Sequence, residues 1–252
     1  MKKQVVAIIL ARGGSKSISK KSIALCADKP LMSYTIEAAK NSKLIDRIII
    51  STDDKEMAEY AKSQGVEVPF MRPKELAEDL TPDLPVMQHA LNWLKENDNS
   101  VPEMIVHLRP TTPLKASSDI DKGIELMRIN PDAESVRSIC EPMHTPFKMF
   151  RLDEGEIYIK PILSKEYPEV FKKYAEPYNM PRQVLPKIWR HSGYVDIIRP
   201  EVIMANSMSG SHIVPLKFDK WRDIDIDSPK ELKEAEIVIE ELRSKGKEPW
   251  QS

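Results

Sequence analysis

Hydrophobic and polar positions alternate along the chain in blocks that have first the period of a strand and then that of a helix. Residues 5–10, VVAIIL, form a continuous apolar run, which is typical of a parallel strand covered on both faces. Residues 30–42 carry apolar side chains at helical spacing, with Pro30 at the start. Further strands are expected within 46–52, 103–108, 133–140, 194–200, 211–218 and 222–227. Further helices are expected within 54–65, 84–97, 116–130 and 228–246.

This order of elements predicts the α/β class, with one open, mostly parallel, doubly wound sheet. Gly65 is expected to end its helix in the left-handed conformation, and a Ser/Asp cap is expected to begin the helix within 116–130. In such sheets ligands gather at the carboxyl ends of the strands. Those ends here carry polar segments, namely ARGGSK (11–16), STDD (51–54) and RPTTP (109–113). A ligand site is therefore expected at that edge.

The composition and periodicity of the sequence change within residues 144–190, which hold several Pro, aromatic and Lys residues without a regular period. A long irregular insertion of this kind usually serves function or docks on a partner chain. We therefore expect one domain over residues 1–252 with 144–190 as an insertion. Residues 247–252, KEPWQS, are expected to form a loose tail.

Composition excludes several classes of protein. The formal net charge of the 252 residues is -1, which argues against a nucleic-acid partner held by bulk charge. The chain has no apolar run of about 18–20 residues, so no membrane span is expected. Cys26 and Cys140 are far apart, as is ordinary in a reduced cytoplasmic protein, and a disulfide between them is not expected.

The loop after the first strand combines flexible backbone with positive charge. Gly13 and Gly14 let backbone N–H groups approach a ligand closely. Four cations, suited to phosphate oxygens, surround them: Arg12, Lys16, Lys20 and Lys21. The loop matches neither the G-x-x-x-x-G-K-[ST] nor the G-x-G-x-x-G pattern. It is either a triphosphate-binding turn, which its position favours, or a solvated basic turn.

An acidic segment lies near the other end of the chain. Asp223, Asp225 and Asp227 alternate with isoleucine, so in an extended segment the three carboxylates point to one face. Like charges crowded in this way are unfavourable without a positive partner. The segment is either a magnesium site bridged to phosphates or a polar strand face neutralised by nearby Lys or Arg.

Taken in series, six segments resemble the acylneuraminate cytidylyltransferases, the CMP-sialic acid synthetase family. They are ILARGGSKSISKKSIALCADKPLMSYTIEAA (9–39), IIISTDD (48–54), RPKELAED (72–79), HLRPTTPLK (107–115), RQVLPKIWRHSGYVDII (182–198) and DIDIDSPKEL (223–232). The resemblance implies a Rossmann-like nucleotidyltransferase that joins CTP to an α-keto sugar acid, releasing pyrophosphate. It further implies a homodimer or dimer of dimers, with 144–190 as the dimerisation segment that also serves the sugar pocket.

The resemblance also assigns roles to residues. For catalysis it implies Lys21, Arg12 and Asp225, and for Mg²⁺ it implies the carboxylates of Asp225 and Asp227. For the nucleotide it implies Leu10, Ala11, Arg12, Gly13, Gly14, Ser15, Lys16, Ser22, Arg72 and Asp79. For the sugar acid it implies Arg109, Thr111, Thr112, Arg182, Gln183, Ser192 and Gly193.

The chain departs from the family pattern at several of these places. Arg109 stands where Gln is usual, and Asp196 stands where Tyr is common. Three serines, at 17, 22 and 192, replace a usual Gly, Asn and Asn. A cation in place of an amide implies a different sugar substituent or stereochemistry, so the substrate is expected to differ from N-acetylneuraminate. The change at Ser22 touches the nucleotide loop, so the choice of CTP needs a direct test.

Two other functions stay open from the residues. A glycosyltransferase also uses a D-x-D metal motif on an α/β sheet, although that motif usually follows a mid-chain strand. A non-catalytic protein could bind CTP or a sugar without turnover. His107, which alternates within the strand at 103–108, is expected to be a strand residue with its hydrogen bonds satisfied.

Overall fold

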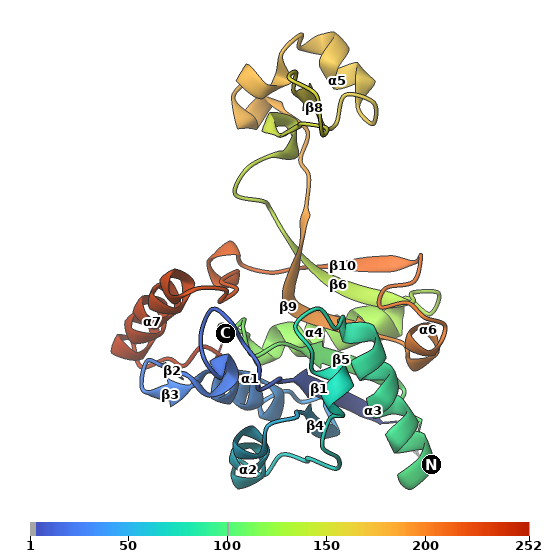
Figure 1. The fold of residues 1–252 in the computed structure, drawn as a ribbon, viewed down its shortest axis with the longest axis vertical. Helices are drawn as coiled ribbons and strands as arrows, with labels where there is room; N and C mark the ends of the chain where they lie inside the picture. Colours follow the sequence, from blue (N-terminus) through green and yellow to red (C-terminus); the bar gives the residue numbers. More distant parts are fainter. Residues whose placement is uncertain (1–3, 100, 252) are drawn as a thin grey trace. The chain divides into compact units, whose positions relative to one another are not determined.

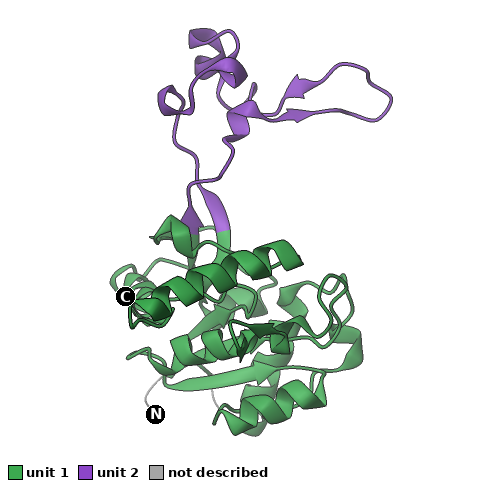
Figure 2. Cartoon of the chain, turned by 90° about the vertical axis from the view of Figure 1, so that its left-hand side faces the viewer, with its two compact units in different colours: residues 1–138, 192–252 green, residues 139–191 purple. Residues whose placement is uncertain are grey.

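The computed structural model describes residues 4–99 and 101–251. It divides into two compact units, which Figure 2 colours separately. The larger one, here called the sheet unit, holds the residues up to 138 and those from 192 onward. The smaller one, here called the inserted unit, holds residues 139–191. The irregular segment 144–190 lies within the inserted unit.

The sheet unit is built on a six-stranded sheet with the order β10-β6-β9-β5-β1-β4 (Figure 1). The strands are β1 (Val5–Leu10), β4 (Arg47–Ser51), β5 (Met104–Leu108), β6 (Ser135–Cys140), β9 (Arg190–Ile198) and β10 (Ile213–Lys217). Strand β1 lies between β4 and β5 and is parallel to both, with Ala7 opposite Ile48 and Val106. Strand β9 runs antiparallel to β5. The predicted α/β sheet is confirmed.

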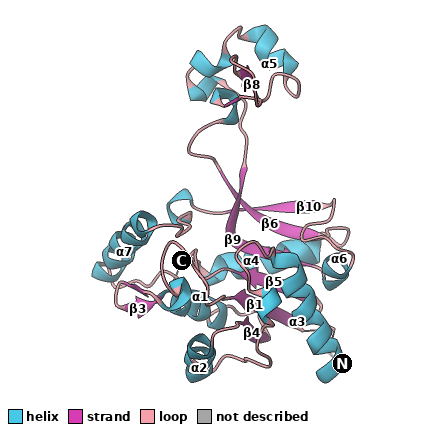
Figure 3. Ribbon diagram, viewed as in Figure 1, coloured by secondary structure: helices cyan, strands magenta, loops and turns pink. Residues whose placement is uncertain are grey.

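Helices cover both faces of this sheet, as Figure 3 shows. They are α1 (Leu31–Lys40), α2 (Lys55–Ser63), α3 (Asp83–Asn97), α4 (Ser117–Ile129), α6 (Pro200–Met204) and α7 (Pro229–Ser244). Short elements follow β1, namely the 3-10 turn η1 (Lys21–Ile23) and the pair β2 (Leu25–Cys26) and β3 (Lys29–Pro30). The 3-10 turns η2 (Lys74–Leu76) and η6 (Lys220–Arg222) lie in later loops.

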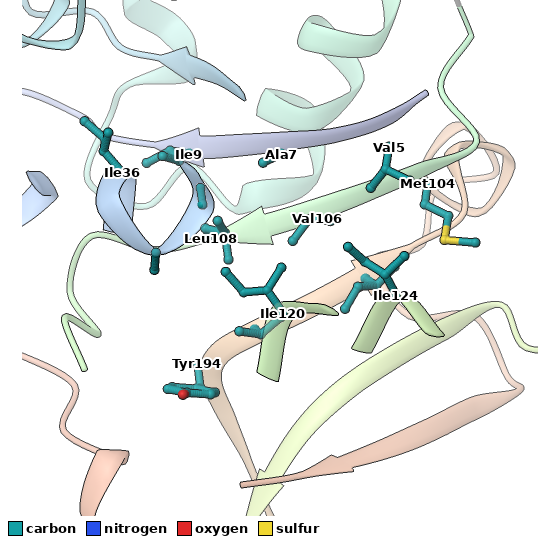
Figure 4. Close-up of a cluster of buried hydrophobic side chains, with 14 of the residues drawn as sticks. Val5, Ala7, Ile9, Ile36, Met104, Val106, Leu108, Ile120, Ile124 and Tyr194 are labelled. Carbon is teal, nitrogen blue, oxygen red and sulfur yellow. The ribbon is translucent and has the colours of Figure 1, made fainter. Parts of the chain in front are cut away.

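Alternate side chains of β1 enter two different cores, which explains why the whole strand is apolar. Val5, Ala7 and Ile9 pack with side chains of α1 and α4, such as Ile36 and Ile124 (Figure 4). The residues between them pack with α3 and α6 in the second cluster, which includes Val6, Ile8, Met87, Leu94 and Val202. Burial of each of these large apolar side chains contributes about 1.5–3 kcal/mol.

Local sequence signals set most of the helix ends. Asp54 caps α2 by accepting a hydrogen bond from the Met57 N–H at 3.0 Å, and Gly65 follows with φ of 68°. Ser228 and Glu231 form a complete capping box at the start of α7. The expected Ser/Asp cap of α4 is wrong, because Ala116 occupies the N-cap position without a side-chain hydrogen bond.

Two other expectations for the sheet unit are wrong. Residues 223–227 form no strand, because the segment follows η6 as irregular backbone alongside the loop after β5. Of the expected tail, residues 247–251 are described and are docked, with the carbonyl of Trp250 accepting from Ser117 N–H at 3.0 Å, while residue 252 lies outside the described residues. The buried Arg222 donates to the carbonyls of Pro249 and Gln251 at 2.7 and 3.1 Å. These long-range contacts hold a segment that has no apolar period of its own.

Close packing between α4 and the sheet makes Gly123 sensitive to substitution. A Cβ at this position would lie 2.4 Å from Cδ1 of the buried Ile197 and 3.4 Å from Cδ2 of Leu216. Gly123→Ala is therefore expected to lower the free energy of unfolding by about 1–3 kcal/mol, although alanine favours helices. Urea denaturation measures this. Glu125→Ala, on the exposed side of α4, is the control and should change stability by no more than about 0.5 kcal/mol.

The inserted unit has a small core of its own. Its elements are β7 (Phe150–Arg151), β8 (Lys160–Pro161), α5 (Pro168–Lys173) and the 3-10 turns η3 (Pro146–Lys148), η4 (Pro177–Asn179) and η5 (Arg182–Val184). Phe147, Val170 and Leu185 form the buried cluster, and β7 pairs antiparallel with β8. No helix in the described parts of either unit has the length and apolar character that crossing a bilayer requires.

Candidate active site

A cavity of about 310 Å³ lies in the sheet unit where β1 and β5 end. Its wall includes ten residues that the sequence assigned to substrates or catalysis: Leu10, Arg12, Gly14, Ser15, Lys21, Ser22, Arg72, Asp79, Arg109 and Thr111. Residues not anticipated complete the wall: Leu76, Glu78, Thr81, Asp83, Val86 and Pro110. The cavity thus joins the loop after β1 to the loop after β5 and to segment 72–83.

The two glycines of the first loop have different surroundings. The N–H of Gly13 donates to Oδ1 of Asp53 at 2.8 Å, so the protein itself uses this donor. A Cβ on Gly13 would lie 3.0 Å from Cβ of Asp54, so a side chain there would force the closely approaching STDD segment to shift by a few tenths of an ångström. A Cβ on Gly14 would meet no atom of the described residues within 4 Å, and Gly14 lines the cavity. Gly14 therefore leaves room for a ligand.

Adjacent lysines in this loop point to different partners. Lys20, in the left-handed conformation with φ of 46°, pairs with Glu56 at 2.5 Å and Asp54 at 3.3 Å. Its ammonium is therefore committed to the start of α2, not to a phosphate as the loop composition indicated. Lys21 Nζ donates to the carbonyl of Ile226 at 2.6 Å and lies 3.4 Å from Asp227 Oδ1. The basic turn and the acidic segment, 205 positions apart, thus meet at Lys21.

The acidic segment 223–227 is not a strand, but its side chains still alternate between buried isoleucines and more exposed aspartates. Ile224 and Ile226 are buried, and the N–H of Ile226 donates to the Thr111 carbonyl at 2.8 Å. Asp223 accepts a hydrogen bond from Ser192 Oγ at 2.7 Å, which gives this carboxylate a partner within the protein. The Asp227 side chain is 83% exposed. The segment is therefore fixed at its isoleucines, while Asp227 stays accessible.

Asp225 and Asp227 have the donor chemistry of a magnesium site. Both offer hard carboxylate oxygens, and Mg²⁺ takes only one or two carboxylates together with water and substrate phosphates. In residues 4–99 and 101–251, no three His, Cys, Asp or Glu side chains are grouped so as to hold a metal. In donor type, the two aspartates therefore match what Mg²⁺ takes from a protein.

Lys115 fixes the loop after β5 and was missed by sequence reasoning. Its side chain is fully buried, and Nζ donates to the carbonyl of Arg109 at 2.6 Å and to both oxygens of Thr112. Burial lowers the pKa of Lys115 well below its usual value, although Asp225 opposes this shift. Thr112 also donates to the Gly193 carbonyl at 3.2 Å and is buried. A lysine before a helix is usually exposed, so no sequence signal marked it.

Arg109 and Asp196, two departures from the family pattern, contact each other. Arg109 Nη1 donates to Asp196 Oδ2 at 2.9 Å, and Nη2 donates to Asp83 Oδ2 at 3.0 Å. Burial lowers the pKa of Arg109, but Asp196 and Asp83 outweigh it and raise that pKa. Neighbouring His107 is a buried strand residue, yet within residues 4–99 and 101–251 neither ring nitrogen has a hydrogen-bond partner, so the expectation of satisfied bonds is wrong. The pKa of His107 is lowered to about 3, mainly because the ring is buried and to a smaller extent because the positive charge of Arg109 lies near it.

Segment 72–81 lies beside the loop after β1 and contacts the cations of that loop. Arg72 is buried and donates to Ser51 Oγ at 3.1 Å and to the Ser51 carbonyl at 2.6 Å, and burial lowers its pKa to about 10. Asp79 lies 2.6 Å from Lys16 Nζ and 3.3 Å from Arg12 Nη1. The hydrogen bond from Lys16 lowers the pKa of Asp79. An incoming triphosphate would compete with Asp79 for these two cations.

The remaining predicted residues lie outside this cavity wall. Arg182 and Gln183 belong to the inserted unit and line a cavity of about 400 Å³ within it. There Arg182 donates to Glu141 Oε2 at 3.2 Å. Buried Ala11 follows β1, and its N–H donates to the Ser51 carbonyl at 3.0 Å. Ser192 and Gly193 lie on β9, beside Asp223 and Arg109 respectively.

Known proteins resemble this chain over nearly its whole length. The sequence model of the cytidylyltransferase family matches residues 6–244. Post-translational flagellin modification protein B of Campylobacter coli is 28% identical over 97% of this chain and 99% of its own length. The CMP-N,N'-diacetyllegionaminic acid synthase of Campylobacter jejuni is 29% identical over 94% of this chain and 95% of its own length.

The fold also matches solved structures. A CMP:2-keto-3-deoxy-manno-octonic acid synthetase complexed with CTP superposes with a TM-score of 0.67 at 15% identity. The match covers 95% of this chain and 99% of that one. The family match spans almost the whole described chain, including both the basic turn and the acidic segment. The chain therefore belongs to the cytidylyltransferase family.

Proposed function

We propose that this protein joins CTP to an α-keto sugar acid of the nonulosonate type, giving a CMP-sugar and pyrophosphate. The observation that carries the proposal is the contact of Lys21 with Ile226 and Asp227, which brings the basic turn and the acidic segment to one place. The name of the full-length relative that makes CMP-N,N'-diacetyllegionaminic acid supports this substrate class. The Arg109–Asp196 pair supports a sugar other than N-acetylneuraminate, since it alters the wall where the family has an amide.

In the proposed reaction the anomeric hydroxyl of the sugar attacks the α-phosphorus in line with departing pyrophosphate. Lys21 and Arg12 line the cavity and would stabilise the negative charge that develops on the phosphoryl oxygens. As the nucleotide binds, Arg12 and Lys16 would break their ion pairs with Asp79 and pair with phosphate oxygens instead. No covalent enzyme intermediate is needed, because the sugar hydroxyl is itself the nucleophile. Asp225 and Asp227 would hold Mg²⁺, which supplies further charge neutralisation on the phosphates.

We propose further that the protein is a homodimer, or a dimer of dimers, formed through the inserted unit. Large apolar side chains of this unit are exposed, namely Met143, Leu152, Ile157, Tyr158 and Ile159. Exposed apolar groups gathered on a small unit commonly mark a protein interface. A cytoplasmic location fits the proposal, because CTP is a cytoplasmic metabolite and the two cysteines are buried thiols.

A matrix of nucleotides and sugar acids tests the function. Purified protein with Mg²⁺ is incubated with each of four nucleoside triphosphates and each of N-acetylneuraminate, N,N'-diacetyllegionaminic acid and 2-keto-3-deoxy-manno-octonic acid. Pyrophosphate release is expected with CTP alone, and faster with the legionaminic acid than with N-acetylneuraminate. Tight CTP binding by calorimetry without turnover of any pair would instead indicate a non-catalytic binding protein. In a separate incubation with a CMP-sugar and no triphosphate, release of CMP would instead indicate a glycosyltransferase.

A further inference from the structure

A cation and a carboxylate flank Gly193 without pairing with each other. A Cβ placed on Gly193 would lie 3.6 Å from Nη1 of Arg109 and 3.6 Å from Oδ2 of Asp225. Cδ of Arg109 would lie closer, at 3.2 Å, so the arginine stem crosses directly over this glycine. In the described chain, the ion pairs of Arg109 are those with Asp83 and Asp196. The guanidinium of Arg109 therefore pairs with these two carboxylates and not with Asp225, although both groups reach the same glycine.

The two carboxylates that hold Arg109 come from different elements. Asp83 begins α3, and Asp196 lies on β9, where it is fully buried opposite His107 of β5. Asp196 also lies 2.5 Å from Nη1 of Arg137 on β6. The positive charges of Arg109 and Arg137 are balanced by the negative charges of Asp83 and Asp196. His107 stays neutral near pH 7, because its pKa is lowered to about 3. The positive charge of Arg109 is thus compensated inside the protein.

A second cation near Asp225 is restrained in a similar way. The buried ammonium of Lys115 interacts electrostatically with Asp225, but its hydrogen bonds go to the carbonyls of Arg109 and Thr112. An arginine released into this partly buried region would gain a strong attraction to Asp225, because charges interact more strongly away from bulk water. A guanidinium paired with that carboxylate would then compete with a divalent cation for it.

We propose that Asp83 and Asp196 act as a clamp that holds Arg109 off Asp225 and so keeps that carboxylate available to a divalent cation. Asp83 and Asp196 are positioning residues in this role, since they act through Arg109. The proposal rests on the proposed function, which places the cation at Asp225 and Asp227. It also accounts for the joint departure at Arg109 and Asp196, because a lone arginine at 109 would close the cation site.

Binding of Mn²⁺ alone to the full chain, followed by loss of the free-ion electron paramagnetic resonance signal, tests the clamp without any turnover. Asp196→Asn keeps the shape of the side chain and frees Nη1 of Arg109, so Mn²⁺ binding is expected to weaken about tenfold. The double variant R109Q/D196N removes the competing cation and should bind Mn²⁺ within about twofold of R109Q. Asp98→Asn, which removes one partner from the Arg47 ion pairs, is the control and should bind like the wild type.

The outcomes distinguish a failure of the clamp from a failure of the proposed function on which it rests. Unchanged Mn²⁺ binding by D196N, or a double variant as weak as D196N, would overturn the clamp. A wild type that neither binds Mn²⁺ nor releases pyrophosphate from CTP would remove the proposed function and the clamp together. Should thermal melting show that D196N is unfolded, Asp83→Asn is used in its place, because the Asp83 side chain is 42% exposed. For Asp83→Asn, the same weakening of Mn²⁺ binding and the same rescue by R109Q are expected.

Discussion

Asparagine in place of Asp225 is expected to lower kcat by about 10²–10³-fold while the protein stays folded. Asp225 alternates with the buried Ile224 and Ile226, and these isoleucines fix the segment, so an amide of equal size should not disturb it. The loss comes from removing a charged oxygen that would hold a divalent cation against the phosphates. Steady-state pyrophosphate release at saturating CTP and sugar acid measures kcat, and circular dichroism checks the fold.

Asp223 provides the matched control for this substitution. It belongs to the same alternating segment, yet its carboxylate accepts a hydrogen bond from Ser192. Asp223→Asn should therefore keep Mn²⁺ binding close to that of the wild type, whereas Asp225→Asn should weaken it. Equal turnover by D225N and wild type would remove the assignment of Asp225 to a cation.

Methionine in place of Lys21 is expected to lower kcat by about 10²–10³-fold. The Lys21 side chain is only 13% exposed, lines the cavity and reaches the Ile226 carbonyl. Methionine has a similar length but provides neither the positive charge nor the donor. Since the charge is needed mainly as pyrophosphate departs, kcat should fall by a larger factor than the Kd for CTP rises. Single-turnover kinetics and calorimetric CTP binding separate the two effects.

The neighbouring lysine offers the control for this second prediction. Lys20 is paired with Glu56 and Asp54 at the start of α2 and lies outside the cavity wall. Lys20→Met should therefore change kcat by less than about threefold, since exposed ion pairs contribute little. Comparable losses in the two variants would mean that the loop needs positive charge in general, not a cation at position 21.

Several features of the fold and the site were readable from local sequence. The apolar run of β1 predicted a strand buried on both faces, and Val6 and Ala7 indeed enter opposite cores. The expected stop at Gly65 is present with positive φ, because glycine adopts that conformation at little cost. For the site, polar strand ends predicted the edge of the sheet where the cavity lies. These features depend on neighbours within a few positions of the chain.

Other features depend on residues that meet only in three dimensions. The sequence left open whether each basic residue of the first loop served a ligand, and the structure separates Lys20 from Lys21 by their partners. The tail was expected to be loose, but Arg222 and Ser117 bind its carbonyl groups. Buried Lys115 had no local signal, because its acceptors become available only when the loop after β5 is folded.

By itself, the sequence determined the order of the main strands and helices of the sheet unit, apart from the strand expected at 222–227, the edge of the sheet where the cavity lies and the chemical types of the groups placed there. Periodicity and backbone preferences act over a few residues, so they can be read along the chain. Only the tertiary structure decided which charges pair, as in Arg109 with Asp196 and Ser192 with Asp223. Such pairing depends on distance and burial between elements far apart in sequence, and the pattern along the chain contains neither quantity.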